Sequence, residues 1–158
     1  YENPREIDTY EITEGEWSNS EAVYEHKAVL FDKEKNLLVI PVSYNEKISV
    51  ADEAYPRYDY WQGAFVFEVD LEGIELRGKI SHQEKENSDY YWGGGNYVKR
   101  SLFMDDYLYT ISDQKVKAND LLTLEDIEEV DLPEIDYGGP VYYAEEGVGV
   151  AVAEAVGK

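Results

Sequence analysis

Two segments of the chain decide its fold: H-K-A-V-L-F-D at His26–Asp32 and V-K-R-S-L-F-M-D at Val98–Asp105. The segments that follow them also align, L-L-V-I-P-V at 37–42 with Y-L-Y-T-I-S at 107–112. All four are short, rich in Val, Ile, Leu, Phe and Tyr, and bounded by Asp, Asn, Gly and Lys, which is the pattern of β-strands and turns. The chain therefore contains a repeated β unit.

Each repeat unit is predicted to contain four strands joined as a meander. The first unit has strands at 27–31, 37–42, 64–70 and 74–81, and the second has strands at 98–103, 107–112, 115–119 and 126–132. One four-stranded sheet cannot bury its apolar face alone and must stack on a neighbour, so repeated meanders predict the blades of a β-propeller. A β-sandwich whose halves are similar by coincidence is the alternative fold.

The remaining segments are interpreted as follows. Ile7–Ile12 alternates as I-D-T-Y-E-I, which is typical of a half-buried strand. Long connections are expected as loops at 15–20, 43–62 and 83–97. Pro41 cannot donate a hydrogen bond within a sheet, so we expect it at a bulge or a strand end.

The charge of the chain excludes several classes of partner. Against 35 Asp and Glu stand 14 Lys and Arg, which gives a formal net charge of -21 over 158 residues. Such a surface repels phosphate backbones and anionic membranes, so no nucleic-acid partner is expected. The absence of Cys excludes disulfides and thiolate sites. No apolar run approaches the roughly 20 residues that span a bilayer, so no direct membrane insertion is expected.

Three longer stretches carry a family resemblance: E-A-V-Y-E-H-K-A-V-L-F-D-K-E-K-N-L-L-V-I-P-V at 21–42, G-A-F-V-F-E-V-D-L-E-G-I-E-L-R-G-K-I-S-H at 63–82, and Y-V-K-R-S-L-F-M-D-D-Y-L-Y-T-I-S-D-Q-K-V-K-A-N-D-L-L-T-L-E-D-I at 97–127. They resemble the secreted archaeal and bacterial proteins with a C-terminal β-propeller distantly related to WD repeats. The resemblance covers about residues 4–133 and implies a fold without a reaction, because that family has no catalytic motif to carry over.

The resemblance also implies a domain organisation and a location. Residues 1–136 would hold about two to two and a half blades, with 5–12 as the outer strand of a preceding blade, 26–82 as one blade and 98–132 as the next. Residues 137–158 depart from the family and are interpreted as a closing strand or a spacer. The implied location is secreted or cell-surface. A propeller typically needs at least four blades, so the others would belong to a longer chain, to another protein or to copies of this one.

No constellation of residues predicts catalysis. A G-x-S-x-G motif is absent. Ser81 and His82 are adjacent, but neighbouring side chains at a strand end point to opposite faces of a sheet. His26 precedes a predicted strand and, by resemblance to WD-type blades, is expected to join a structural hydrogen-bond network. We therefore expect a protein that is not an enzyme.

Aromatic side chains in the two longest predicted loops are the candidate binding residues. They are Tyr55, Tyr58, Tyr60, Trp61, Tyr90, Tyr91, Trp92 and Tyr97. Tyr and Trp dominate protein-binding hot spots and can stack on sugar rings. The same side chains could instead fold back over the blade ends, and both interpretations stay open.

Acidic residues in predicted turns are the candidate cation ligands. They are Asp32, Asp105, Asp106 and Asp113. Ca²⁺ is the cation that such oxygen ligands would hold, but no D-x-D-x-D-G run is present. Asp also favours turns because it hydrogen-bonds the local backbone, and this interpretation is preferred. No cofactor is therefore expected apart from Ca²⁺ as a weak candidate.

The function expected from these features is that of a non-enzymatic scaffold for protein interactions. It would be secreted or on the cell surface and would form part of a larger chain or assembly. Two alternatives stay open: a carbohydrate-binding module that uses the loop aromatics, and an accessory propeller of a hydrolase.

Overall fold

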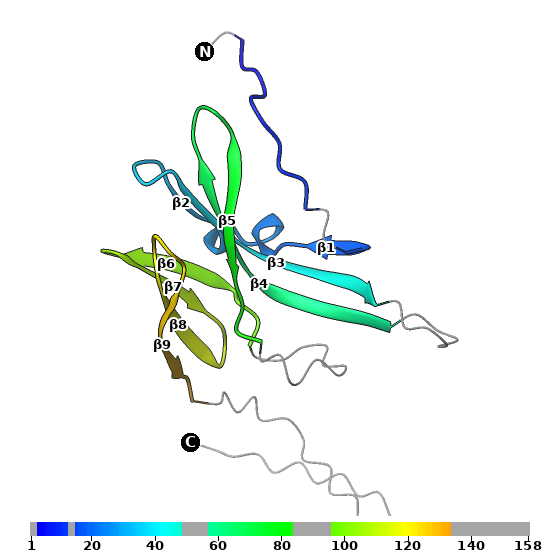
Figure 1. The fold of residues 1–158 in the computed structure, drawn as a ribbon, viewed down its shortest axis with the longest axis vertical. Helices are drawn as coiled ribbons and strands as arrows, with labels where there is room; N and C mark the ends of the chain where they lie inside the picture. The colour runs from blue at the N-terminus through cyan, green and yellow to red at the C-terminus, as the bar shows by residue number, and fades with distance from the viewer. Residues whose placement is uncertain (1–2, 13–14, 49–56, 84–95, 134–158) are drawn as a thin grey trace, which may run out of the picture.

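The computed structural model describes residues 3–12, 15–48, 57–83 and 96–133 (Figure 1). Their regular structure is β-strand apart from two single-turn 3-10 helices, η1 (Glu21–Val23) and η2 (His26–Ala28). The strands lie in two antiparallel sheets, so the predicted all-β class is confirmed. No helix in this part of the chain is long and apolar enough to cross a membrane.

The first sheet is built around a long hairpin. Its strands are β1 (Trp17–Asn19), β2 (Leu30–Asp32), β3 (Leu37–Ile48), β4 (Arg57–Val69) and β5 (Ile74–Ile80). β4 pairs with β3 on one side and with β5 on the other. β2 and β1 pair with opposite ends of the other edge of β3. The strands β2 to β5 therefore form the predicted four-stranded meander, to which β1 is added.

The second sheet is a simple meander. It contains β6 (Arg100–Met104), β7 (Tyr107–Ile111), β8 (Lys115–Asp120) and β9 (Asp126–Asp131), paired in that order. Each of these strands lies within about a residue or two of its predicted position. Both sheets have a bulge in their last strand pair, where the extra residue is Arg77 in β5 and Ile127 in β9. This shared irregularity supports the internal repeat.

The predicted loops at 43–62 and 15–20 are wrong, because strands run through both. β3 and β4 continue as a paired ladder as far as Ile48↔Arg57. β1 pairs with the same end of β3, and it starts after Gly15, whose φ is +83°. A side chain at Gly15 would collide with the backbone of Asn45, so only glycine fits at this turn.

The strands expected at 5–12 and 27–31 also differ from the structure. Residues 3–12 are extended but unpaired: the Asp8 carboxylate accepts a hydrogen bond from the backbone N–H of Ile74 (2.9 Å), while Tyr10 packs edge-on against Phe67. No described strand pairs with this segment, and its place as the outer strand of a preceding blade stays a prediction. At 27–31, the Glu25 carboxylate accepts a hydrogen bond from the N–H of Lys27 and caps η2, so the strand begins only at Leu30.

Pro41 lies within β3, paired with Ala64, and not at the expected bulge or strand end. β2 pairs with β3 up to Val39, and β1 pairs with it from Ser43 onward, so the edge of β3 between them is open. The Pro41 carbonyl faces this gap and accepts a hydrogen bond from the Ser20 hydroxyl at 2.6 Å. The missing N–H of proline costs nothing there, because no strand pairs with β3 on that edge at Pro41.

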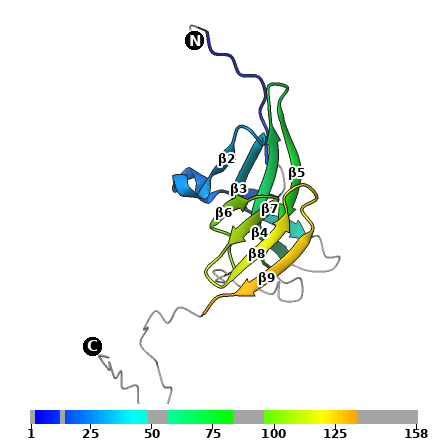
Figure 2. The same ribbon diagram turned by 90° about the vertical axis from the view of Figure 1, so that its left-hand side faces the viewer.

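The main core lies between the two sheets, which pack face to face (Figure 2). Its buried residues are Leu37, Val39, Ala64, Val66 and Ile80 from the first sheet and its end, with Val98 and Leu108 from the second part of the chain. A second cluster, around Phe65 and Phe67, lies on the opposite face of the first sheet, where Tyr10 and Ile12 cover part of it. The first sheet is therefore apolar on both faces.

Leu108 gives the first test of this packing. Its side chain is fully buried in the core between the sheets, so Leu108→Ala is expected to lower the free energy of unfolding by about 3 kcal/mol. Leu122 is 82% exposed, and Leu122→Ala is expected to change the free energy of unfolding by less than about 0.5 kcal/mol. Urea unfolding followed by tryptophan fluorescence measures both. Equal losses in the two variants would contradict the packing.

Candidate interaction surface

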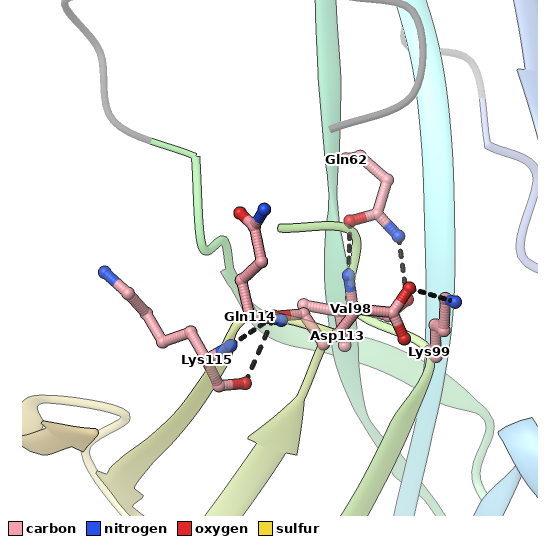
Figure 3. A network of polar contacts seen from close by, with 7 residues as sticks. Gln62, Val98, Lys99, Asp113, Gln114 and Lys115 are labelled. Atoms are coloured by element: carbon pink, nitrogen blue, oxygen red, sulfur yellow. Dashed lines mark hydrogen bonds and ion pairs between the residues drawn. The ribbon is translucent and has the colours of Figure 1, made fainter. Parts of the chain in front are cut away.

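The Gln62 side chain joins the two sheets (Figure 3). Its Nε2 donates to the carbonyl of Val98 at 2.8 Å, and its Oε1 accepts from the N–H of Val98 at 2.7 Å. Both residues are buried. Gln62 on β4 thus binds the backbone that leads into β6 as a neighbouring strand would, and fixes where the second sheet starts.

A second polar contact between the sheets is made by His82, which follows β5. Its Nε2 lies 2.8 Å from Thr110 Oγ1 on β7, and the residue is only 3% exposed. Burial, with Lys117 and Lys115 nearby, lowers the pKa of His82 to about 4. The structural hydrogen bond expected at His26 is therefore made by His82, whereas His26 is exposed and lies 3.6 Å from the Glu25 carboxylate.

Of the predicted aromatic residues, Tyr58, Tyr60 and Trp61 lie on β4, so their placement in a loop is wrong. Trp61 stacks on Tyr44 of β3 with 5.1 Å between ring centroids, and Lys79 Nζ lies over both rings. The Tyr58 hydroxyl donates to Glu16 at 3.1 Å, which raises the pKa of the phenol.

Among the described residues, the structure brings together one pair of the predicted aromatic side chains from the two loops. Tyr60 and Tyr97 lie with 5.6 Å between ring centroids. Tyr55, Tyr90, Tyr91 and Trp92 lie outside the described residues. Trp61 packs against the cluster around Phe65 and Phe67, on the face of the first sheet that is opposite the second sheet. Trp61 and the pair of Tyr60 and Tyr97 therefore contribute to packing within the chain. A role for any of them in binding stays a prediction.

The predicted acidic residues lie at the ends of strands. Asp32 ends β2 and accepts a hydrogen bond from the N–H of Lys35 at 2.8 Å, as expected of a turn residue. Asp113 forms an ion pair with Lys99 at 2.6 Å (Figure 3). Asp105 and Asp106 occupy the β6–β7 turn. Within the described ranges, no three His, Cys, Asp or Glu side chains are grouped so that they could hold a metal ion.

The outer face of the second sheet, which points away from the first, carries a shallow apolar groove of about 280 Å³. It is lined by Tyr107, Tyr109, Val116, Ala118, Ile127 and Val130. Glu128 is its one charged lining residue. Leu102 and Met104 extend this face onto β6, because they pair across the ladder with Tyr109 and Tyr107. We call this surface the outer face.

The outer face is exposed although it is apolar. Met104 is 56% exposed, Ile127 52% and Val130 58%. The inner face of the same sheet holds Leu108 and Thr110, which are fully buried against the first sheet. Among the described residues, the second sheet is therefore covered on its inner face and left exposed on its outer face.

A family model described as a beta propeller domain matches residues 1–124. The chain belongs to this family. No curated protein and no solved structure matches it. The two sheets are thus propeller blades, and the alternative of a β-sandwich is set aside. We interpret β2 to β5 as one blade and β6 to β9 as the next.

In a propeller, blades stack face to face around a central axis, so each blade normally has a neighbour on both faces. The outer face has no such neighbour among the described residues. Sequence reasoning missed this surface, although β7 reads Y-L-Y-T-I, and a strand with large apolar residues on both faces is typical of burial from two sides. It also missed Gln62, because no local pattern marks a side chain that bonds to backbone 36 residues away.

Proposed function

We propose that this propeller segment is a non-enzymatic protein-interaction scaffold whose outer face binds a further four-stranded blade. The observation that carries the proposal is the exposed apolar groove on β7 to β9. Contiguous apolar surface of this kind is uncommon unless another surface covers it. The further blade would belong to the same longer polypeptide or to a partner in an assembly.

The junction inside the chain indicates what such a blade must offer. There, the first blade presents a central apolar patch that includes Val39 and Val66, with polar side chains at its margins. One of these, Arg77, donates from its Nη2 to the carbonyls of Leu121 and Leu122 at 2.7 and 2.8 Å. We therefore expect a partner blade with an apolar centre and a basic residue near its margin.

Charge supports the same partner chemistry. Glu128 lines the groove, and the chain as a whole has a net charge of -21. A basic residue opposite Glu128 would favour docking, while the overall acidic charge opposes association with another acidic protein. Salt screens this repulsion, so assembly with an acidic partner is expected to be stronger at about 0.5 M than at about 0.05 M salt.

The extracellular location and the kinship to WD repeats remain parts of this proposal. They rest on the resemblance of residues 21–42, 63–82 and 97–127 to secreted archaeal and bacterial propeller proteins. A scaffold is the role that fits a fold with an open docking face and no proposed catalytic residues.

The native mass of protein isolated from its source, with identification of every co-purifying chain, tests the proposal. We expect a particle larger than the 18.2 kDa of this sequence, containing additional propeller blades. A stable folded monomer of this mass at both salt concentrations would contradict the docking role. Robust turnover of peptide or glycan substrates would contradict the non-enzymatic role.

A further inference from the structure

Two blades of this chain are joined by a buried histidine. His82 lies just after β5, the last strand of the first blade. Its ring is hydrogen-bonded to Thr110 on β7. Its neighbour Ser81 donates a hydrogen bond to the carbonyl of Gln62 at 2.7 Å, which fixes the backbone on the first-blade side. The hydrogen bond between His82 and Thr110 therefore spans the junction.

The second ring nitrogen of His82, Nδ1, has no acceptor for the hydrogen that it would carry in the protonated ring. Nδ1 is buried and has no hydrogen-bond partner among the described residues. When Nε2 donates to the Thr110 hydroxyl, Nδ1 of the neutral ring carries only a lone pair. In the protonated ring both nitrogens carry hydrogen, so a buried donor would be left without an acceptor, which is strongly unfavourable.

Of the charges that shift the pKa of His82, the two with the larger effects act in the same direction. β8 contributes Lys115 and Lys117, which disfavour a cation on the ring, and β9 contributes Glu129, which favours it. That carboxylate is already bound to Lys115 at 2.9 Å, and Asp126 on β9 is bound to Lys117 at 2.7 Å. A protonated His82 ring would thus lie near two lysine side chains. The two carboxylates nearby are already in ion pairs with these lysines.

We propose that His82 is an acid-sensitive latch between the two blades: the neutral ring holds the first blade to Thr110, and protonation of the ring releases this contact and loosens the junction. The latch acts inside the chain and does not depend on the docking role of the outer face. It provides a means by which acidity could open a propeller at one defined junction.

The direction of the pH effect follows from the two states. The pKa of His82 is about 4 in the folded protein, against 6.5 for an ordinary histidine, so the unfolded chain binds a proton more readily between these values. The stability from the latch is complete above about pH 6.5 and is lost as the pH falls toward 4. Asp126 and Glu129, whose pKa values are lowered by their lysine partners, contribute a separate loss at lower pH.

Comparison of the full chain with His82→Gln isolates the latch, because glutamine can bond to Thr110 but does not titrate. Between pH 7 and about pH 4.5, the unfolding equilibrium constant of the wild type should rise roughly 50-fold more than that of His82→Gln. His26→Gln is the matched control, because the His26 side chain is 89% exposed, and it should behave as the wild type does. Equal pH dependence in wild type and His82→Gln would overturn the proposal.

A measurement on the wild type keeps the proposal testable if His82→Gln does not fold. The NMR signals of the two histidine rings can be followed against pH, together with amide exchange in both blades. Exchange in β6 and β7 should accelerate as His82 takes up its proton, while the β3–β4 hairpin stays protected. Protonation of His82 with unchanged exchange in β6 and β7, or uptake of the proton near pH 6.5, would overturn the latch.

Discussion

Gln62→Leu is expected to lower the free energy of unfolding by about 4 kcal/mol. The substitution keeps the size of the side chain but removes both hydrogen bonds to Val98. The N–H and the carbonyl of Val98 would then be buried without a partner, and each such group costs about 2 kcal/mol. Because Gln62 holds the backbone that leads into β6, amide exchange at the start of the second blade should also accelerate.

Two further variants of this prediction control for its cause. Gln114→Leu makes the same chemical change at an exposed position and is expected to stay within about 0.5 kcal/mol of the wild type. Gln62→Glu keeps an acceptor for the N–H of Val98 but loses the donor to its carbonyl, so it separates the two bonds. Chemical unfolding measures all three proteins. A loss below about 1 kcal/mol in Gln62→Leu would show that the bond pair does not join the blades.

The double variant Ile127→Asp/Val130→Asp is expected to weaken binding of the further blade by more than about 100-fold. Both side chains lie in the groove of the outer face and are more than half exposed in the chain alone. Docking would bury two carboxylates against apolar surface, which costs several kcal/mol, and each 1.4 kcal/mol is a factor of ten in affinity. The isolated chain should keep its stability, because these positions are solvent-exposed before docking.

A matched control separates this effect from added negative charge. Leu71→Asp/Leu122→Asp introduces the same two charges at side chains that are 87% and 82% exposed and do not line the groove. Its binding should fall far less than that of the groove variant. Analytical ultracentrifugation of each protein with its co-purified partner gives the comparison. Equal weakening of both double variants would mean that overall repulsion, and not the outer face, governs assembly.

The sequence allowed the second blade to be predicted almost residue by residue, because its strands are short, apolar and separated by turns rich in Asp. The first blade was harder to predict. The far ends of β3 and β4 mix aromatic and polar residues, as in S-Y-N-E-K-I at 43–48, and such a mixture is also typical of a loop. Ile7–Ile12 has a strand-like alternation, but Asp8 bonds to the backbone of β5 without a ladder.

The candidate site depended on contacts that the sequence pattern does not contain. Gln62 reaches Val98, and His82 reaches Thr110, across separations of 36 and 28 residues. Only the packing of one blade on the other brings these groups together. The ring of Tyr60 contacts that of Tyr97 and the ring of Trp61 contacts that of Phe65, on a strand that the sequence pattern did not predict, and a binding role for these side chains stays a prediction.

Oxidative footprinting at Met104 tests the central claim, that another blade covers the outer face, most directly. Met104 is the only methionine of the chain, it shares the outer face with Tyr107, and it is 56% exposed. We expect rapid sulfoxide formation in the isolated chain and strong protection in the source-isolated assembly, with Tyr24, which is 79% exposed, as the reference for general access of the oxidant. Equal oxidation of Met104 in both preparations would contradict the account.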